Sequence, residues 1–305
     1  MSDTLVGRVV AAFGRHLLVR DATGAELRAR PFGRAQSAVC GDEVRCRIDA
    51  QHDELHVIEV LPRVSALWRA TLRGGAEPVV ANLTHLLVVL APLPVPDLFV
   101  VDRYLAAATA GGITATLVVN KSDLGIDADL SAELAVYEAA GYRVRSTSAE
   151  TGAEVAALPA LLGAGSIAAL VGQSGVGKSS LVQRLVPQAQ IAIGELVREE
   201  EGRHTTTAAR LFELPGGAGL IDSPGVRDFA PAVEALDERS LGFVEVERLA
   251  VGCRFNDCRH MREPGCAIRA AAESGALHPR RYQSYRRLRR LREELTAARG
   301  PKRTR

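Results

Sequence analysis

Residues 172–179 read Gly-Gln-Ser-Gly-Val-Gly-Lys-Ser, which fits the pattern G-x-x-x-x-G-K-[ST]. The apolar run 167–171 comes directly before this stretch, and a helical pattern over 180–186 follows it and stops at Pro187. Glycines in such a loop let backbone N–H groups turn toward one anion, and the helix start adds positive potential. The stretch predicts a strand, a phosphate-binding loop and a helix; the alternative is a glycine-rich helix start without a ligand.

Each residue of this loop is a candidate contact for a nucleotide. Lys178 would neutralise the outer phosphates, which also makes it a candidate catalytic residue, and the Ser179 hydroxyl would coordinate Mg²⁺. The complete set of candidate phosphate contacts is Gly172, Gln173, Ser174, Gly175, Val176, Gly177, Lys178, Ser179 and Ser180.

A second motif, Asn120-Lys121-Ser122-Asp123, follows the buried-type strand 115–119. The Asp123 carboxylate could accept the two donors on the Watson–Crick edge of guanine, which adenine does not offer. A further strand over 143–147 leads to Ser148, Ala149 and Glu150, which we expect to lie behind the base. Only three of the 38 basic residues are lysines, and two of them stand in these two motifs. The alternative to a guanine site is a solvated Asn/Asp turn.

The order of the two motifs decides the topology. In ordinary small GTPases the phosphate loop opens the domain and the base-reading motif follows it, whereas here residues 120–123 come before residues 172–179. Both motifs must still meet at one nucleotide, so the order predicts a circularly permuted guanine-nucleotide-binding domain.

A third motif, Asp222-Ser223-Pro224-Gly225, ends the strand pattern 219–221 and fits D-x-x-G. We expect Asp222 to hold Mg²⁺ through water and the Gly225 N–H to contact the γ-phosphate. The polar segment 194–207 is typical of a mobile switch, and we expect Thr206 to reach Mg²⁺ and the γ-phosphate. Val226 stands where many GTPases carry a water-positioning glutamine, so His204 is the candidate catalytic residue that orients water; a surface histidine is the alternative.

Four soft metal ligands, Cys253, Cys258, His260 and Cys266, lie within fourteen residues among turn-forming residues. Three thiolates and one imidazole can close a tetrahedral site and leave no open position, so we expect one structural zinc ion. A disulfide-bonded loop is the alternative, but it needs an oxidising compartment. Cys40 and Cys46 flank a turn far from this cluster and are expected to be core residues.

Together these motifs resemble the RsgA (YjeQ/YloQ) family of circularly permuted GTPases that depend on the small ribosomal subunit. The resemblance extends over nearly the whole chain. It implies a multidomain α/β protein: an N-terminal OB-fold at 1–62, a permuted P-loop GTPase domain at 63–229 and a C-terminal helical zinc domain at 230–305. It also rests on further motifs: Pro62-Arg63, Asp102-Arg103-Tyr104-Leu105 and Gly202-Arg203-His204-Thr205-Thr206-Thr207.

The two ends of the chain differ in what they predict. Residues 1–62 contain five short strand patterns, which suit a small barrel, with eight arginines against nine acidic residues and only Phe13 and Phe32 as stacking surfaces. RNA contact there is implied by the resemblance. Residues 280–305 carry eleven basic residues against two acidic ones, on a helix whose apolar face packs while its arginines point outward. Contact with rRNA is the functional interpretation, and a solvated basic helix is the alternative.

The composition, 47% hydrophobic and 24% charged with a net charge of +2, is that of a globular protein, without a signal peptide or a long apolar span. We expect a cytoplasmic, monomeric GTPase that hydrolyses GTP when stimulated by the small ribosomal subunit, late in the maturation of that subunit. One alternative is a nucleotide-gated rRNA-binding factor in which hydrolysis is incidental. Another is an ATPase or nucleotide kinase, in which Asp123 would not select guanine.

Overall fold

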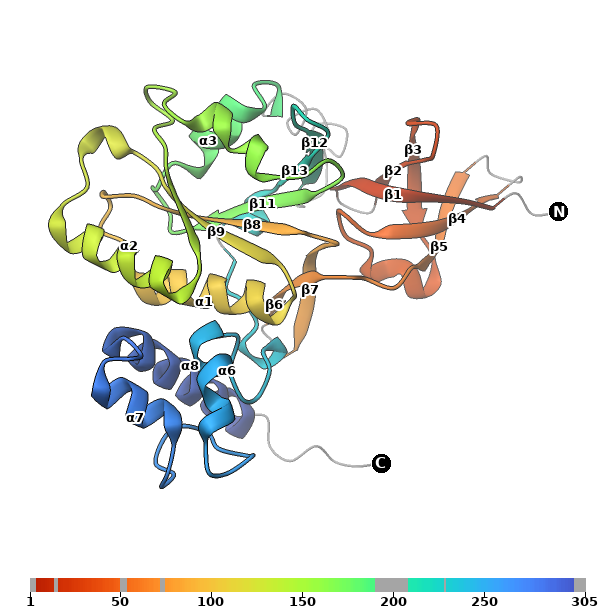
Figure 1. Ribbon diagram of the computed structural model, residues 1–305. Coiled ribbons are helices and arrows are strands. Elements are labelled where there is room, and N and C mark those ends of the chain that lie inside the picture. Colours follow the sequence, from red (N-terminus) through yellow and green to blue (C-terminus); the bar gives the residue numbers. More distant parts are fainter. Residues whose placement is uncertain are drawn as a thin grey trace, which may run out of the picture.

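The computed structural model describes residues 4–13, 16–49, 54–71, 75–189, 208–227 and 229–298. Three parts follow one another along the chain: a β-barrel, a central sheet covered by helices and a C-terminal group of helices (Figure 1). The barrel lies at one end of the central part, and the C-terminal helices pack along the side formed by α1 (Leu98–Ala110). This arrangement confirms the predicted fold class. None of the helices in the described ranges has the length and apolar character needed to cross a bilayer.

The barrel closes because its strands pair in a ring. β1 pairs with β2 and β4, β3 pairs with β2 and β5, and β4 pairs with β5. Alternate residues of these strands form a separate core that includes Val9, Val19, Val57 and, as predicted, the buried Cys46. The five strands are β1 (Thr4–Phe13), β2 (His16–Arg20), β3 (Glu26–Pro31), β4 (Glu43–Asp49) and β5 (Glu54–Val60).

The central sheet has the order β10-β9-β8-β11-β13-β12. All neighbours in it are parallel except β12 and β13, which are antiparallel. The strands that precede the phosphate loop in sequence therefore lie on one side of β11, and those that follow it lie on the other. The bounds are β8 (His85–Leu90), β9 (Thr114–Val119), β10 (Arg143–Ser146), β11 (Ile167–Gly172), β12 (Ala209–Glu213) and β13 (Gly219–Asp222).

Helices cover both faces of this sheet, so its inner strands are apolar on both sides. On β8, Leu86 and Val88 pack toward α1 and α2 (Ala128–Ala140), whereas Leu87 and Val89 pack toward α3 (Lys178–Leu185). Asp97 caps the start of α1, because its carboxylate accepts hydrogen bonds from the Phe99 and Val100 N–H groups of the first turn.

Short elements connect these parts. A hairpin of β6 (Ala66–Ala70) and β7 (Ala76–Ala81) leads from the barrel into the sheet, and α5 (Pro224–Arg227) follows β13. The 3₁₀ turns are η1 (Gly33–Ser37), η2 (Ser122–Leu124), η3 (Val155–Ala157), η4 (Pro159–Leu161), η5 (Val233–Ala235) and η6 (Ala250–Gly252).

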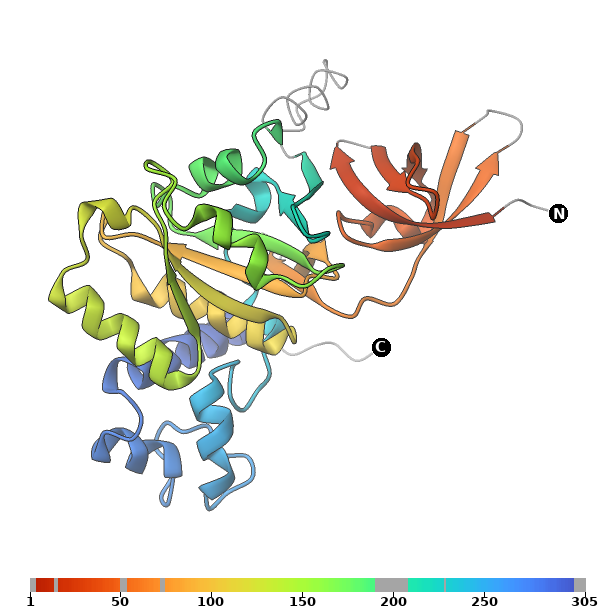
Figure 2. The same ribbon diagram turned by 45° about the horizontal axis from the view of Figure 1, so that its top comes forward.

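The barrel is joined to the central part by backbone and by an ion pair. β1 continues the central sheet by pairing with β12, with Ala11 opposite Arg210 (Figure 2). Arg63, just after the barrel, donates to both carboxylate oxygens of the buried Asp42 at 2.7 and 2.8 Å. A side chain at Gly41 would lie 2.0 Å from the Ala81 carbonyl oxygen, so the two parts approach too closely there for any other residue.

The C-terminal part consists of α6 (Val244–Leu249), α7 (Ala267–Ser274) and α8 (Pro279–Ala298). Tyr285 and Leu288 of α8 are buried in its core, as the spacing of apolar residues predicts. The expectation that the arginines of this helix point outward is wrong for Arg281 and Arg289, which are 1% and 5% exposed. Arg281 is buried because it pairs with carboxylates of two other helices, Asp102 at 2.6 Å and Glu245 at 2.7 Å.

Candidate active site

The side chain of Asn120 joins the guanine motif to the phosphate loop. Its Nδ2 donates to the Val176 carbonyl oxygen at 2.9 Å, and its Oδ1 accepts from the Ala149 N–H at 3.0 Å. The Thr147 hydroxyl donates to the same Oδ1 at 3.4 Å. Asn120 is fully buried. Three segments that lie apart in sequence therefore meet at one amide, as the convergence of the two motifs requires.

Gly177 is required for this contact. Its φ is +93°, which other residues rarely adopt, and a Cβ atom there would lie 2.3 Å from Nδ2 of Asn120. The third glycine of the phosphate loop thus makes room for the residue that opens the guanine motif.

The candidate base-binding residues form a connected rim around Asp123. The Ser148 hydroxyl donates to the exposed Asp123 carboxylate, and Lys121 Nζ donates to the Leu93 carbonyl at 3.0 Å. Arg184 of α3 donates to the carbonyls of Ala149 and Glu150 at 2.9 and 2.6 Å. The loop 148–150, which we expect to lie behind the base, is therefore held by the helix that follows the phosphate loop. Ser122 lies in η2 beside Asp123, half-buried.

The phosphate loop runs from β11 into α3, as predicted. The Lys178 ammonium is buried and donates to the carbonyls of Gly172 and Gln173, each at 2.8 Å. Ser174 and Gly175 of the loop are exposed, as are Ser179 and Ser180 at the start of the helix. These residues are therefore open to solvent, whereas the lysine between them is buried.

The predicted magnesium ligands Asp222 and Ser179 lie close together, and a residue that sequence reasoning missed connects them. Arg227 donates through Nε and Nη2 to the two Asp222 carboxylate oxygens at 2.7 and 2.5 Å. Its Nη1 donates to Ser179 Oγ at 2.6 Å. The only signal in the sequence is a basic residue two positions beyond Gly225, which by itself predicts nothing. Val226 is buried in the core, so it does not face the site.

Two candidate catalytic residues, His204 and Thr206, lie outside the described residues. Their roles stay predictions.

The four predicted metal ligands come together. One ligand atom from each of Cys253, Cys258, His260 and Cys266 lies within 4.8 Å of the others, and Nδ1 of His260 lies 3.5 Å from two of the sulfurs. Ligands of a tetrahedral zinc ion lie roughly 3–4 Å apart, given zinc–sulfur bonds of about 2.3 Å. The cluster can therefore hold one zinc ion. All five cysteines are unpaired, so the disulfide alternative is not seen.

The surroundings of the cluster favour metal ligation. Burial, with smaller effects of Arg289 and Arg239, lowers the pKa of His260 to about 4, which keeps the imidazole neutral. Burial raises the pKa of the Cys258 thiol to about 12, so a bound cation is what would stabilise the thiolate. The Tyr282 hydroxyl donates to the His260 carbonyl at 2.7 Å, which ties the cluster to α8.

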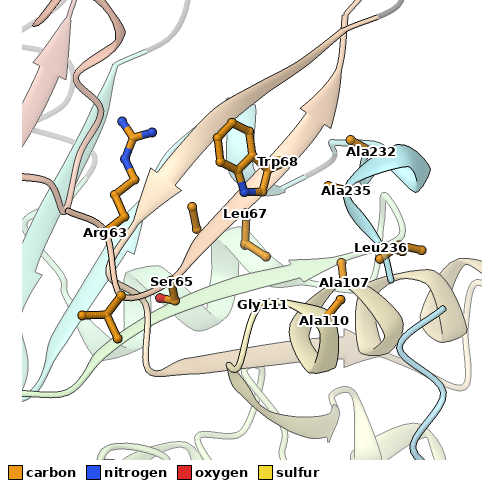
Figure 3. Close-up of a pocket in the computed structure, with 12 residues that line it drawn as sticks. Arg63, Ser65, Leu67, Trp68, Ala107, Ala110, Gly111, Ala232, Ala235 and Leu236 are labelled. Atoms are coloured by element: carbon orange, nitrogen blue, oxygen red, sulfur yellow. The ribbon is translucent and has the colours of Figure 1, made fainter. Parts of the chain in front are cut away.

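A cavity of about 260 Å³ lies elsewhere, between β6, α1 and residues 232–236 (Figure 3). Leu67 from the hairpin points toward the end of α1, where Ala107, Ala110 and Gly111 lie, whereas the Trp68 ring points away from the helix. No residue of the nucleotide motifs lines this cavity, and Arg63 is the one charged residue among those that line it. It is therefore unsuited to a nucleotide triphosphate.

Comparison with known proteins agrees with this site. The family model described as RsgA GTPase matches residues 60–231. "Small ribosomal subunit biogenesis GTPase RsgA" from Azotobacter vinelandii is 42% identical over 92% of this chain and 83% of that relative. The protein of the same name from Chromohalobacter salexigens is 44% identical over 92% and 84%.

Solved structures share the fold at lower identity. YjeQ from Thermotoga maritima superposes with a TM-score of 0.71 at 24% identity, covering 98% of this chain and 100% of that one. YloQ, described as a circularly permuted GTPase, has a TM-score of 0.68 at 24% identity, covering 98% and 97%. Family, relatives and fold agree with the motif order, and the chain belongs to the RsgA GTPase family.

Proposed function

We propose that one GTP molecule binds across the two permuted motifs, with Asp123 on guanine and residues 172–180 on the phosphates. The observation that carries this proposal is the 2.9 Å hydrogen bond from Asn120 Nδ2 to the Val176 carbonyl, because it fixes the spacing between the two motifs. Ser179 and Asp222 would hold the Mg²⁺ that accompanies GTP in this family, and the Gly225 N–H would contact the γ-phosphate.

Guanine selection is tested at Asp123. A carboxylate accepts both N–H donors of guanine, whereas an asparagine side chain presents one acceptor and one donor group. We expect Asp123→Asn to weaken GDP binding and to reduce the preference for GDP over ADP, measured by competition against a fluorescent GDP analogue. An unchanged preference would favour the ATPase or nucleotide-kinase alternative.

The sequence offers few candidate catalytic groups for the hydrolysis step. Val226 brings no polar atom to the usual water-positioning site, so His204 remains the proposed water-orienting residue and Thr206 the proposed magnesium ligand. Slow hydrolysis without a partner follows, because the switch must first be ordered. Single-turnover hydrolysis by His204→Ala tests the assignment, and a rate equal to that of the wild type would remove it.

The proposed partner is the small ribosomal subunit, and the proposed role is its late maturation. Both relatives above carry that subunit in their names. GTP turnover with and without purified small subunits is the decisive measurement. Strong stimulation would support a GTPase driven by the subunit, whereas nucleotide-dependent binding without stimulation would support the alternative of a gated assembly factor in which hydrolysis is incidental.

Contact with rRNA is proposed through the barrel and the basic C-terminal residues. Phe32 is 55% exposed and stacks on His56, with ring centroids 5.5 Å apart, so it presents an aromatic face on which a base can stack. Phe13 is buried and does not. Arg287 and Arg290 are exposed on α8. Binding that weakens steeply as salt rises is expected, and a flat salt response would contradict phosphate contact.

The remaining proposals follow from this partner. A cytoplasmic location is proposed because the proposed partner is the small ribosomal subunit, and a monomer is proposed because each chain carries both nucleotide motifs. The proposed division of the chain is an RNA-binding barrel at 1–62, a GTPase domain at 63–229 and a zinc-binding basic domain at 230–305. The match of the family model to residues 60–231 supports the middle part.

A further inference from the structure

Arg227 makes an unusually complete contact with two residues of the nucleotide site. Its guanidinium uses Nε and Nη2 for the Asp222 carboxylate and Nη1 for Ser179 Oγ, at 2.7, 2.5 and 2.6 Å. Asp222 is 2% exposed, and the Arg227 side chain is 18% exposed. A two-point contact between guanidinium and carboxylate is among the strongest hydrogen-bonded pairs in proteins.

The contact uses the oxygen atoms that the proposed function assigns to magnesium. Both carboxylate oxygens of Asp222 accept from Arg227, and Ser179 Oγ directs a lone pair at the same positive charge. A divalent cation held by these oxygens would lie against the guanidinium, and the two like charges would repel. Arg227 and Mg²⁺ therefore cannot share Asp222 and Ser179 in this arrangement.

Local geometry lets the arginine leave without unfolding its surroundings. α5 is a single short turn, in which the Val226 and Arg227 N–H groups donate to the Ser223 carbonyl, each at 3.1 Å. Val226 is buried and anchors this turn in the core beside Phe229. The guanidinium reaches back over five residues to Asp222, so rotation of one long side chain is enough to release both oxygen ligands.

We propose that the Arg227 guanidinium competes with Mg²⁺ for Asp222 and Ser179. While it is bound there, it holds residues 222–227 in a conformation without bound Mg²⁺. The strength of this contact thereby sets how strongly Mg²⁺ promotes nucleotide binding. This inference rests on the proposed nucleotide site. A purely structural ion pair is the competing explanation: its loss would change the stability of the protein but would leave the effect of Mg²⁺ on nucleotide affinity unaltered.

The test measures the Kd of a fluorescent GDP analogue with excess chelator and with saturating Mg²⁺, in the full-length wild type, Arg227→Ala and Arg227→Lys. The quantity of interest is the Kd measured with chelator divided by the Kd measured with Mg²⁺, which reports how strongly Mg²⁺ promotes nucleotide binding. We expect this ratio to rise at least about tenfold in Arg227→Ala, the scale on which a charge-assisted hydrogen bond changes an equilibrium. Arg227→Lys keeps the charge but not the fork, so its ratio is expected to lie between the other two.

Arg184→Ala is the matched comparison, because Arg184 holds the guanine loop and not the magnesium ligands. Its loss is expected to weaken GDP binding by the same factor with and without Mg²⁺. If Arg227→Ala behaves in that way, or leaves the ratio at the wild-type value, the proposal is wrong.

Hydrogen exchange of the wild type provides a second readout that needs no substitution. Adding Mg²⁺ to the GDP-bound protein is expected to change amide exchange in residues 222–227, and identical exchange would contradict the displacement of Arg227. Failure of the wild type to bind GDP in either condition would instead contradict the proposed nucleotide site, and this inference with it. Tight binding with equal ratios in all three proteins contradicts only the role of Arg227.

Discussion

Replacement of Asn120 by alanine tests whether one buried amide holds the permuted motifs in register. The substitution removes two good hydrogen bonds, at 2.9 and 3.0 Å, and a longer one at 3.4 Å. It leaves the Val176 carbonyl and the Ala149 N–H without these partners. A typical hydrogen bond contributes about 1 kcal/mol, and a buried group left unpaired costs about 1–3 kcal/mol, so we expect a loss of about 2–4 kcal/mol.

Nucleotide affinity is expected to fall along with stability. Without Asn120, GDP itself must bring the guanine motif and the phosphate loop together when it binds. Up to the same 2–4 kcal/mol is therefore lost from the free energy of binding, which corresponds to roughly a 30- to 700-fold rise in Kd. The assay combines titration with a fluorescent GDP analogue and unfolding in urea, because the first reports affinity and the second reports stability.

Asn82→Ala provides the matched control outside the site. Asn82 Oδ1 accepts from the Val64 N–H at 2.9 Å, and its Nδ2 donates to the Gly41 carbonyl at 3.0 Å. Its loss is expected to lower stability by a similar amount and to leave GDP affinity unchanged. The reasoning is refuted if folded Asn120→Ala binds GDP as tightly as the wild type, or if both variants lose affinity equally.

Three further outcomes are expected. Arg281→Met leaves the buried Asp102 and Glu245 short of a partner and is expected to cost about 3–5 kcal/mol in urea unfolding, whereas Arg290→Ala on the exposed face changes stability by less than about 0.5 kcal/mol. Chelation of zinc, followed by metal analysis and thermal unfolding, is expected to destabilise the C-terminal helices; unchanged melting of the metal-free protein would argue against a structural ion. Burial opposes ionisation of Asp237, but hydrogen bonds from the Ser240 hydroxyl and from backbone N–H groups outweigh it and lower the pKa of Asp237 below 3.8. Its stabilising effect is therefore present above pH 3.8 and lost as the pH falls further, so the stability difference between wild type and Asp237→Asn is expected to shrink there; a difference independent of pH would contradict this assignment.

The parts of the site that could be predicted are those in which neighbouring residues carry the whole signal. Strand, loop and helix around Lys178 are contiguous, and so are the four metal ligands between Cys253 and Cys266, whose clustering is confirmed. The five barrel strands were equally readable, because alternation of apolar residues and intervening glycines mark them locally.

The parts that could not be predicted depend on partners far away in sequence. The periodicity of the helix predicts that Arg281 lies on the surface. The pattern contains no information about its partners Asp102 and Glu245, because these lie on other helices. The contact of Arg227 with Ser179 spans 48 residues, and the register of β1 against β12 spans nearly 200. Such contacts are set by how the elements pack in three dimensions, which no local pattern encodes.

The pairing of β1 with β12 also has a consequence for self-association. β12 would otherwise end the central sheet with a row of free backbone donors and acceptors, onto which strands of other molecules can add. At the opposite border, β10 has only four residues and carries the exposed charges of Arg143 and Arg145, which discourage such addition. A fragment lacking the barrel is therefore expected to dimerise through its β12 border and not to extend further through β10.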